Sequence, residues 1–407
     1  MKKITVIVLI LSLILVFMPS CGFFLIPPTA TETDTKDETE ITETETETET
    51  ETEAETEEDT EEFEPEIPVH SMPYYNTGRR YAWSTLNKEK RRLYNEVLVA
   101  ALCFAEYVML PDADTAKYIY ECVFFDSPEL FYLSETPKIE DNKLIFDYVF
   151  TLEEAEKTAR ELNYAYSEFL QSEIKEELTD YEKLIALYEY IINRTKYADE
   201  ASEDYDNNIF NEAVYRSASA IGPLLDCRAI CIGYARATQY LALRLGIQTF
   251  TVKGADTDGD VHYYDLVLLG DDYYYVDTTW GDPVDPERIK DYLTYNYFCI
   301  TTDELLRSHQ TNTSVTLPVC TATEYNYFIY NGLTAETAEE IANKAYEAYM
   351  RGDAEIRLKV DFDKLDTVYD GLKDAMNRIF LEKGLAGVSY AYGRSKGPST
   401  VFVKFTY

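Results

Sequence analysis

The strongest constraint on how this chain folds is an acidic tract that cannot join a hydrophobic core. Residues 32–66 contain nineteen Asp or Glu against a single Lys, and most of the remaining residues are Thr. Such a stretch buries too little apolar surface to offset the cost of ordering, and its like charges repel one another. We therefore expect a disordered, extended stalk over residues 22–72 and a folded part that begins at residue 73.

Residues 1–21 predict where the folded part resides. Two lysines precede an apolar run over residues 4–18, and Cys21 follows the small residue Ser20. This pattern is typical of a signal peptide, and the apolar run is short for a membrane span. The junction also resembles the lipobox of bacterial lipoproteins, which implies a lipid on Cys21 and a protein anchored to the bacterial cell membrane, facing the extracytoplasmic side. Cleavage without lipidation, or an uncleaved helical anchor, would leave the chain in the same compartment.

The formal net charge of −38 at pH 7 restricts the partners of the protein. Nucleic-acid binding needs a basic surface that displaces the counterions of the phosphate backbone. We therefore expect no nucleic-acid partner. An acidic surface suits a soluble domain outside the cell.

Residues 73–212 predict a mainly helical N-terminal region. Apolar residues at three- and four-residue spacing indicate helices over 86–109, 112–125 and 153–174. Thr179 is a suitable N-cap for a further helix. Residues 198–212 are acidic and polar, so they predict a loop.

The pattern changes from Ala213 onwards. A helix is predicted over 229–245 with Gly246 as its C′ residue, and three strands follow it, over 246–254, 262–270 and 272–280. Residues 331–407 form a separate α-β-α-β-β pattern, which indicates a small α+β domain for packing or partner contact. The whole folded part is therefore predicted to be α+β.

The stretch LDCRAICIGYA contains two cysteines, Cys227 and Cys231. Cys231 lies in the first turn of the predicted helix, where the backbone N–H groups and the helix dipole favour a thiolate. Gly233 allows close approach by another backbone or by substrate. Alternatives for the two thiols are a disulfide, a zinc site and burial in the core; a disulfide would block a nucleophile, and zinc lacks a second ligand pair. We expect Cys227 to be structural.

A thiol nucleophile needs a base, and the chain has three histidines: His70, His262 and His309. His262 opens a predicted strand, and Asp277 follows on the next one. If Gly270 and Asp271 form a two-residue hairpin loop, His262 and Asp277 become diagonal neighbours on one face. A three-residue loop would place them on opposite faces. His309 is interpreted as a structural histidine, and Trp280 as core or cleft wall.

A helix-initiating Cys231 followed by GYA, then LGI, a strand-opening His262 and YYYVDTTWGDP, resembles the bacterial transglutaminase-like superfamily. Its members share a papain-like Cys–His–Asp triad. The resemblance covers residues 80–310 and implies a transglutaminase-like core over 213–330, in which the helix carrying the cysteine packs on an antiparallel sheet. It implies that Cys231 is the nucleophile, His262 the general base and acid, and Asp277 the residue that orients the imidazole.

The resemblance implies no cofactor and no metal, and it leaves the oxyanion donor open. The Cys231 backbone N–H is the favoured donor, with Tyr234 or another cleft tyrosine as a candidate. The chain departs from the family at residues 262–265, which read HYYD where the family often has His-Ala-Trp-Asn. That difference is expected to change the cleft wall and not the triad.

These features predict a surface-anchored thiol enzyme that transfers an acyl group from an amide through a Cys231 thioester. Hydrolysis is favoured over cross-linking, and the substrate is expected to be a protein or peptide, with cell-wall peptide as one option. The alternative is a catalytically silent binding or adhesion module of the cell surface.

Overall fold

The computed structural model describes residues 79–175, 177–282 and 293–406. The predicted signal peptide, the lipidation site Cys21 and the acidic stalk lie outside these residues. Within the described ranges, no helix is both long and apolar enough to cross a bilayer. Helices and several antiparallel sheets share the described chain, which confirms the predicted α+β class.

The N-terminal region is a group of helices, and all of them except α2 start at a capping side chain. Its members are α2 (Tyr81–Thr85), α3 (Lys88–Leu102), α4 (Ala113–Asp126), α5 (Leu152–Glu173) and α6 (Asp180–Arg194). Asp112 accepts a hydrogen bond from the backbone of Thr115 at the start of α4. Thr179 and Glu182 form a capping box at the start of α6, so the predicted N-cap is confirmed.

The helix predicted over 86–109 is too long at its C-terminal end. α3 stops at Leu102, and Phe104 has a left-handed φ of 53°. The ring of Phe104 stacks on Tyr132 and Tyr148, at centroid distances of 4.7 and 4.6 Å. The chain then joins a small antiparallel sheet of order β1-β3-β2, formed by β1 (Tyr107–Met109), β2 (Lys138–Glu140) and β3 (Lys143–Ile145). Tertiary stacking and strand pairing therefore outweigh the helical periodicity.

The prediction of a loop over residues 198–212 is wrong. This segment contains α7 (Asp199–Asp206) and the start of α8 (Glu212–Ser217). Two acidic residues in the first turn of α7 interact favourably with the helix dipole. Ala201 is buried, and the hydroxyl of Tyr205 donates to Glu135, which is distant in sequence. These tertiary contacts stabilise a short helix that composition alone did not indicate.

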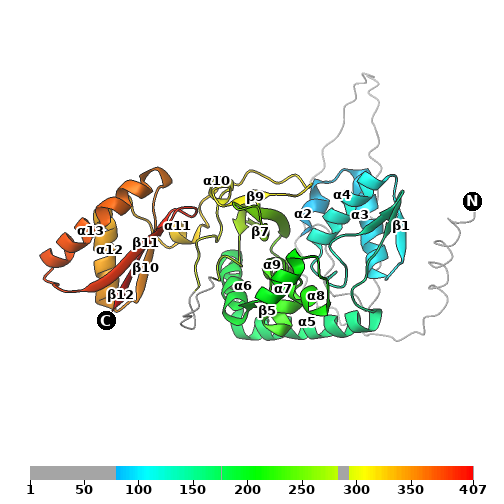
Figure 1. The fold of residues 1–407 in the computed structure, drawn as a ribbon, viewed down its shortest axis with the longest axis horizontal. Coiled ribbons are helices and arrows are strands. Elements are labelled where there is room, and N and C mark those ends of the chain that lie inside the picture. The colour runs from blue at the N-terminus through cyan, green and yellow to red at the C-terminus, as the bar shows by residue number, and fades with distance from the viewer. Residues whose placement is uncertain (1–78, 176, 283–292, 407) are drawn as a thin grey trace, which may run out of the picture. The chain divides into compact units, whose positions relative to one another are not determined.

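The central sheet has the order β8-β7-β6-β9 and is antiparallel throughout. Its strands are β6 (Thr249–Asp256), β7 (Val261–Leu269), β8 (Asp272–Val276) and β9 (His309–Thr311). Leu269 pairs with Asp272, which confirms the predicted two-residue hairpin loop. α9 (Cys231–Arg244) packs against β6 and β7 and also contacts α6 (Figure 1). The helix that carries Cys231 therefore packs on an antiparallel sheet.

The helix predicted over 229–245 begins at Cys231 in the structure, two residues later than predicted, because residues 228–229 pair as a strand. β5 (Arg228–Ala229) pairs in parallel with β4 (Lys196–Tyr197), and a π-helical segment, η2 (Gly222–Asp226), precedes β5. Gly246 ends α9 with φ 89°, as predicted. Strand pairing before Cys231 thus sets the start of α9, and the positive φ of Gly246 sets its end.

One hydrophobic cluster extends from Tyr81 to Cys320, so the helical region and the central sheet share a core. α10 (Thr302–Leu305) and α11 (Tyr327–Tyr330) follow the sheet. A second cluster lies in the C-terminal module, between Ala335 and Phe405. The exact domain boundaries remain predictions.

The C-terminal module has the predicted α-β-α-β-β order (Figure 1). Its elements are α12 (Ala338–Arg351), β10 (Glu355–Lys359), the short helix η3 (Phe362–Lys364), α13 (Leu365–Glu382), β11 (Ser389–Ser395) and β12 (Thr400–Thr406). β12 is the middle strand, between β10 and β11. An ion pair between Lys359 and Glu304 joins this module to the preceding part.

Candidate active site

Cys231 is the first residue of α9, and the segment before it sets its position. The backbone N–H of Ile230 donates to the carbonyl of Ser217 at 3.1 Å. Ile230 provides no side-chain cap for α9. The N–H groups and the dipole at this helix end favour negative charge, whether on a thiolate or on an oxyanion.

Gly233 holds the first turn of α9 against the same segment. A Cβ atom on Gly233 would lie 2.0 Å from the carbonyl oxygen of Ser217 and 3.1 Å from the Cβ of Ala229. Only glycine fits this contact without displacing backbone. The predicted close approach at Gly233 is therefore made by another backbone segment.

Cys227 is separate from Cys231 in both conformation and environment. It has a left-handed φ of 55° after η2, and its Sγ lies 3.7 Å from Nη2 of Arg194. Both cysteines are free thiols, and Cys231 is the more buried, at 8% exposure. Cys227 and Cys231 therefore form no disulfide, and they do not line the same pocket.

His262 and Asp277 meet at one end of the central sheet. His262 is the second residue of β7, and Asp277 follows the last residue of β8. Nε2 of His262 lies 2.7 Å from Oδ2 of Asp277. The backbone N–H of Trp280 donates to the other carboxylate oxygen at 2.9 Å. The hairpin register thus places the predicted pair within hydrogen-bond distance.

Burial and ion pairing shift the pKa values of His262 and Asp277 in opposite directions. Burial alone would lower the pKa of His262, but the Asp277 carboxylate and hydrogen bonds with Asp277 and Cys231 raise it to about 10. Burial would raise the pKa of Asp277, but the charge of His262 and the hydrogen bonds from His262 and His309 hold it well below the usual range. His262 is 7% exposed and Asp277 1% exposed, so solvent screens the pair weakly. Both shifts therefore favour the charged forms of the two groups.

The structure places Cys231 and His262 in one cleft, with Asp277 hydrogen-bonded to His262. Cys231 and His262 line the same cavity of about 520 Å³, and the nearby Cys231 side chain is one of the groups that raise the pKa of His262. Nε2 of His262 binds Asp277, so Nδ1 is the ring nitrogen left to exchange a proton with the thiol. A cationic imidazole beside a thiol favours the thiolate, the form that attacks carbonyl carbon. The arrangement has the parts that nucleophilic acyl transfer needs.

The wall of this cleft is acidic. Asp206, Asp256, Asp260 and Asp282 line it together with Cys231 and His262. Two of these residues belong to an acidic turn, in which Oδ1 of Asp256 accepts the backbone N–H groups of Asp258 and Asp260. A cleft lined by carboxylates attracts substrates that carry positive charge.

His309 is the site residue that the sequence did not reveal. It begins β9, and its Nε2 lies 3.0 Å from the same Oδ2 of Asp277 that His262 contacts. Its Nδ1 lies 2.9 Å from the hydroxyl of Ser308. The Trp280 ring packs 4.2 Å from the His309 ring and 5.2 Å from the His262 ring, which confirms Trp280 as part of the cleft wall. His309 is thus a positioning residue for Asp277, and not only a structural histidine.

Removing the His309 ring is expected to weaken the hold on Asp277. In His309→Ala, the rate of Cys231 alkylation by iodoacetamide at pH 6 should fall about 10-fold, the value of one hydrogen bond to a charged group. The pH dependence of this rate should also change, because the hydrogen bond by which His309 lowers the pKa of Asp277 is lost. His309→Gln keeps an N–H donor and should restore most of the rate. Profiles of both variants that match the wild type would contradict this role.

His262, Asp277 and His309 also have the donor types of a metal site. In the part of the chain that the structure describes, their ligand atoms lie within 4.8 Å of one another. Two imidazoles and a carboxylate suit Zn²⁺ or Fe²⁺. The same atoms already form the hydrogen bonds of 2.7 and 3.0 Å, so an ion here would replace the contact that orients His262. The absence of a resident metal remains a prediction from the sequence.

Tyr197 fits the oxyanion role better than the suggested Tyr234. The Tyr234 hydroxyl donates to Asp282 at 2.7 Å, and Tyr234 is not among the residues that line the cleft. Tyr197 lines the cleft, and burial together with the nearby Cys231 raises its pKa, so its hydroxyl keeps its proton. The first-turn N–H groups of α9 and the Tyr197 hydroxyl are therefore the candidate donors.

Comparisons with known proteins give only distant similarity. No protein-family model and no curated protein sequence matches the chain. A crystal structure of a TGase is similar over 52% of this chain and 53% of that chain, with a TM-score of 0.28 and 15% identity. A candidate cysteine protease from Cytophaga hutchinsonii is similar over 29% of this chain and 37% of that chain, with a TM-score of 0.23 and 16% identity. The chain thus spans about half the length of the first structure, and similarity at this level establishes neither a shared fold nor a shared function.

Proposed function

We propose that this protein is a transglutaminase-like thiol hydrolase that cleaves an amide of a protein or peptide. The observation that carries the proposal is that Cys231, at the start of α9, shares one cavity with His262, whose ring is hydrogen-bonded to Asp277 at the adjacent end of the sheet. A helix-terminal thiol, an imidazole and an orienting carboxylate are the three parts of a nucleophilic triad.

The first half of the reaction forms a thioester. The Cys231 sulfur attacks the carbonyl carbon of the amide, and the carbonyl oxygen takes the negative charge. That charge lies near the first-turn N–H groups of α9 and the Tyr197 hydroxyl, which are donors of the kind that stabilise an oxyanion. His262 then gives its proton to the nitrogen, the carbon–nitrogen bond breaks, and an amine leaves.

The second half of the reaction releases the acyl group. Neutral His262 accepts a proton from water, and the resulting hydroxide attacks the thioester carbon. The carbon–sulfur bond breaks, a carboxylic acid forms, and the thiolate–imidazolium pair returns. Throughout both halves, Asp277 keeps the ring oriented through Nε2 and stabilises its charged form.

The location of the enzyme is part of the proposal and rests on residues 1–72. A signal peptide with Cys21 at its end supports a lipid anchor on the extracytoplasmic side of a bacterial membrane. The acidic tract would then act as a spacer between membrane and enzyme. The acidic cleft supports a substrate with basic groups, and amine-containing cell-wall peptides are one such class.

The proposal is tested by trapping the acyl-enzyme. The full chain is incubated with a mixture of peptides and denatured within seconds, and the protein is analysed by intact and peptide mass spectrometry. We expect an acyl adduct on Cys231 and none in Cys231→Ala, whereas Cys227→Ala should behave as the wild type.

The products separate hydrolysis from cross-linking. With cadaverine added, hydrolysis predicts free carboxylic acid as the main product, and cross-linking predicts the cadaverine amide. Peptides that bind the full chain but give no adduct and no product would contradict the proposal and favour the silent binding module.

A further inference from the structure

A second cavity adjoins the cleft that contains Cys231. Its volume is about 300 Å³, and it shares the lining residues Tyr205, Asp206 and Val261 with that cleft. Ile232 lines this cavity, while its chain neighbour Cys231 lines the cleft. Because Cys231 and Ile232 are consecutive residues at the start of α9, a substrate held at Cys231 lies next to the second cavity.

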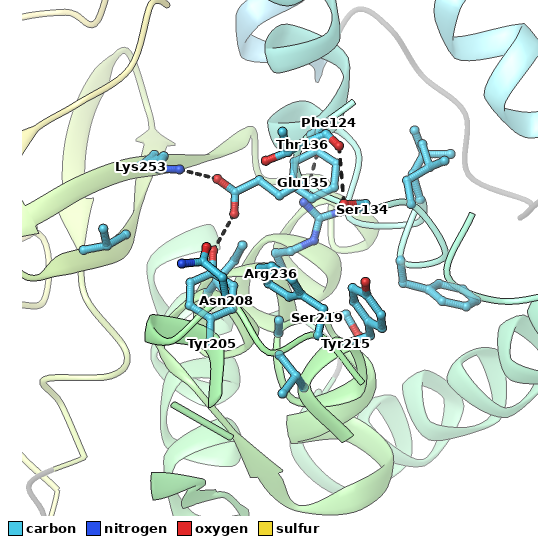
Figure 2. A pocket seen from close by; sticks show the side chains of 18 of the residues that line it. Phe124, Ser134, Glu135, Thr136, Tyr205, Asn208, Tyr215, Ser219, Arg236 and Lys253 are labelled. Carbon is cyan, nitrogen blue, oxygen red and sulfur yellow. Dashed lines mark hydrogen bonds and ion pairs between the residues drawn. The ribbon is translucent and has the colours of Figure 1, made fainter. Parts of the chain in front are cut away.

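The wall between the two cavities is fixed by hydrogen bonds. The Tyr205 hydroxyl donates to Glu135 at 2.6 Å and lies 3.0 Å from the Tyr263 hydroxyl, which donates to the same carboxylate at 2.8 Å. Lys253 forms an ion pair with that carboxylate as well. Figure 2 shows Glu135 between Lys253 and Tyr205 at the edge of the cavity. The cavity is thus preformed.

Apart from Asp206, which lies where the cavity adjoins the cleft, the charged groups of the cavity are satisfied by the protein itself. Glu135 has three donors, as described above. Arg236 donates to the carbonyl oxygens of Phe124 and Ser127 at 3.0 and 2.9 Å, and its guanidinium lies 4.3 Å from the Phe124 ring centroid (Figure 2). A charged ligand group would have to break one of these arrangements. The cavity therefore favours an uncharged occupant.

Part of the remaining wall is apolar and aromatic, and Ser134, Thr136, Asn208 and Ser219 add polar groups to it. Phe210 lies edge-on to Tyr205 at 5.8 Å and stacked on Tyr215 at 6.0 Å. Leu133 and Val214 add aliphatic surface. Phe210 is 49% exposed, so about half of this hydrophobic ring is open to solvent at the cavity. Aromatic pairs of this kind bind a further ring through the same edge-to-face and stacked contacts.

We propose that this second cavity binds a large aromatic side chain of the peptide whose acyl group Cys231 attacks. The proposal rests on the proposed function and adds its substrate class: peptides with Phe, Tyr or Trp at or next to the residue that supplies the carbonyl. Burial of the ring in the cavity would place that carbonyl at the thiol. Phe210 is then a specificity-determining residue.

The test compares matched covalent probes on the full chain. Acetyl-Phe-Gly and acetyl-Gly-Phe chloromethyl ketones are compared with acetyl-Gly-Gly chloromethyl ketone, and iodoacetamide measures the reactivity of the thiol alone. In each case the Cys231 sulfur forms a bond to the probe carbon and a halide leaves. We expect at least one Phe probe to react about 10-fold faster than the Gly-Gly probe, the effect of burying one large apolar side chain.

Phe210→Ala and its neighbour Ile209→Ala form a matched pair of variants. Ile209 is 52% exposed, close to the exposure of Phe210, and lines neither cavity. Phe210→Ala should reduce the Phe-to-Gly rate ratio several-fold, towards one, and Ile209→Ala should leave the ratio unchanged. Each rate is divided by the iodoacetamide rate of the same variant, so a general change in the thiol cancels.

The outcomes separate this inference from the function it rests on. A fast iodoacetamide reaction at Cys231 with equal rates for all three ketones would overturn the aromatic subsite and leave the thiol enzyme standing. An equal loss of the ratio in Ile209→Ala would also overturn it. A thiol that is inert to iodoacetamide and to every ketone would overturn both proposals.

Discussion

Replacing His262 by alanine is expected to lower kcat for acyl transfer by about 10⁴-fold, because both proton transfers and the cationic partner of the thiol are lost. The imidazole lines the same cavity as Cys231 and is held by Asp277, so its removal affects each step of the proposed reaction. The side chain contributes little to peptide binding, so KM should change far less than kcat. The loss should therefore appear in single-turnover acylation as well as in steady-state turnover.

The same variant is measured without a known substrate by alkylation. At pH 6, Cys231 in His262→Ala should react with iodoacetamide about 100-fold more slowly than in the wild type, a typical contribution of one acid–base group. Cys227→Ala serves as the matched thiol control, because Cys227 lies near Arg194 and outside the Cys231 cleft. Equal alkylation rates in His262→Ala and the wild type would show that the ring does not activate the thiol.

The candidate triad was predictable because each member lies in a pattern that local rules describe. Cys231 begins an apolar helix that is followed by Gly246. His262 and Asp277 belong to a hairpin whose two-residue loop sets the register. A hairpin loop with Gly270 in first position fixes which residues share a face. Local sequence therefore placed the site to within a few residues.

His309 and the second cavity depend on contacts between distant parts of the chain. β9 joins the sheet by pairing His309 with Asp256, and no pattern in residues 309–311 indicates that partner. Tyr205 belongs to a short helix whose stability comes from Glu135 and Tyr263. The acidic composition of this segment predicted a loop, since composition carries no information about tertiary hydrogen bonds. The missed features share one cause, which is non-local pairing.

These non-local contacts are what give Asp277 its role. One carboxylate oxygen receives two imidazoles from separate strands, and the other receives the backbone of Trp280. A carboxylate with this many partners cannot rotate away from His262 without losing several of them. The orientation of the triad is thus determined by the closure of the sheet at β9, and not by the hairpin alone.

Replacing Asp277 by asparagine is expected to lower kcat about 10³-fold, because the side chain keeps its shape but loses the charge that stabilises the imidazolium. The variant should also change how stability depends on pH. The pKa of His262 is raised from its ordinary 6.5 to about 10, so the stabilisation from the pair is fully present below pH 6.5 and is lost as the pH rises towards 10. The pKa of Asp277 is lowered, so its share is lost only in acid, as the pH falls through its folded value.

The measurement is the free energy of unfolding in urea at pH 6 and at pH 10, for the wild type and for Asp277→Asn. The wild type should lose more stability than the variant between the two pH values, since only the wild type has the pair to lose. The many buried tyrosines and thiols that also titrate at alkaline pH are common to both proteins, so their effect cancels in the difference. An equal loss in the two proteins would show that the His262–Asp277 pair does not couple protonation to folding, even if kcat falls as expected.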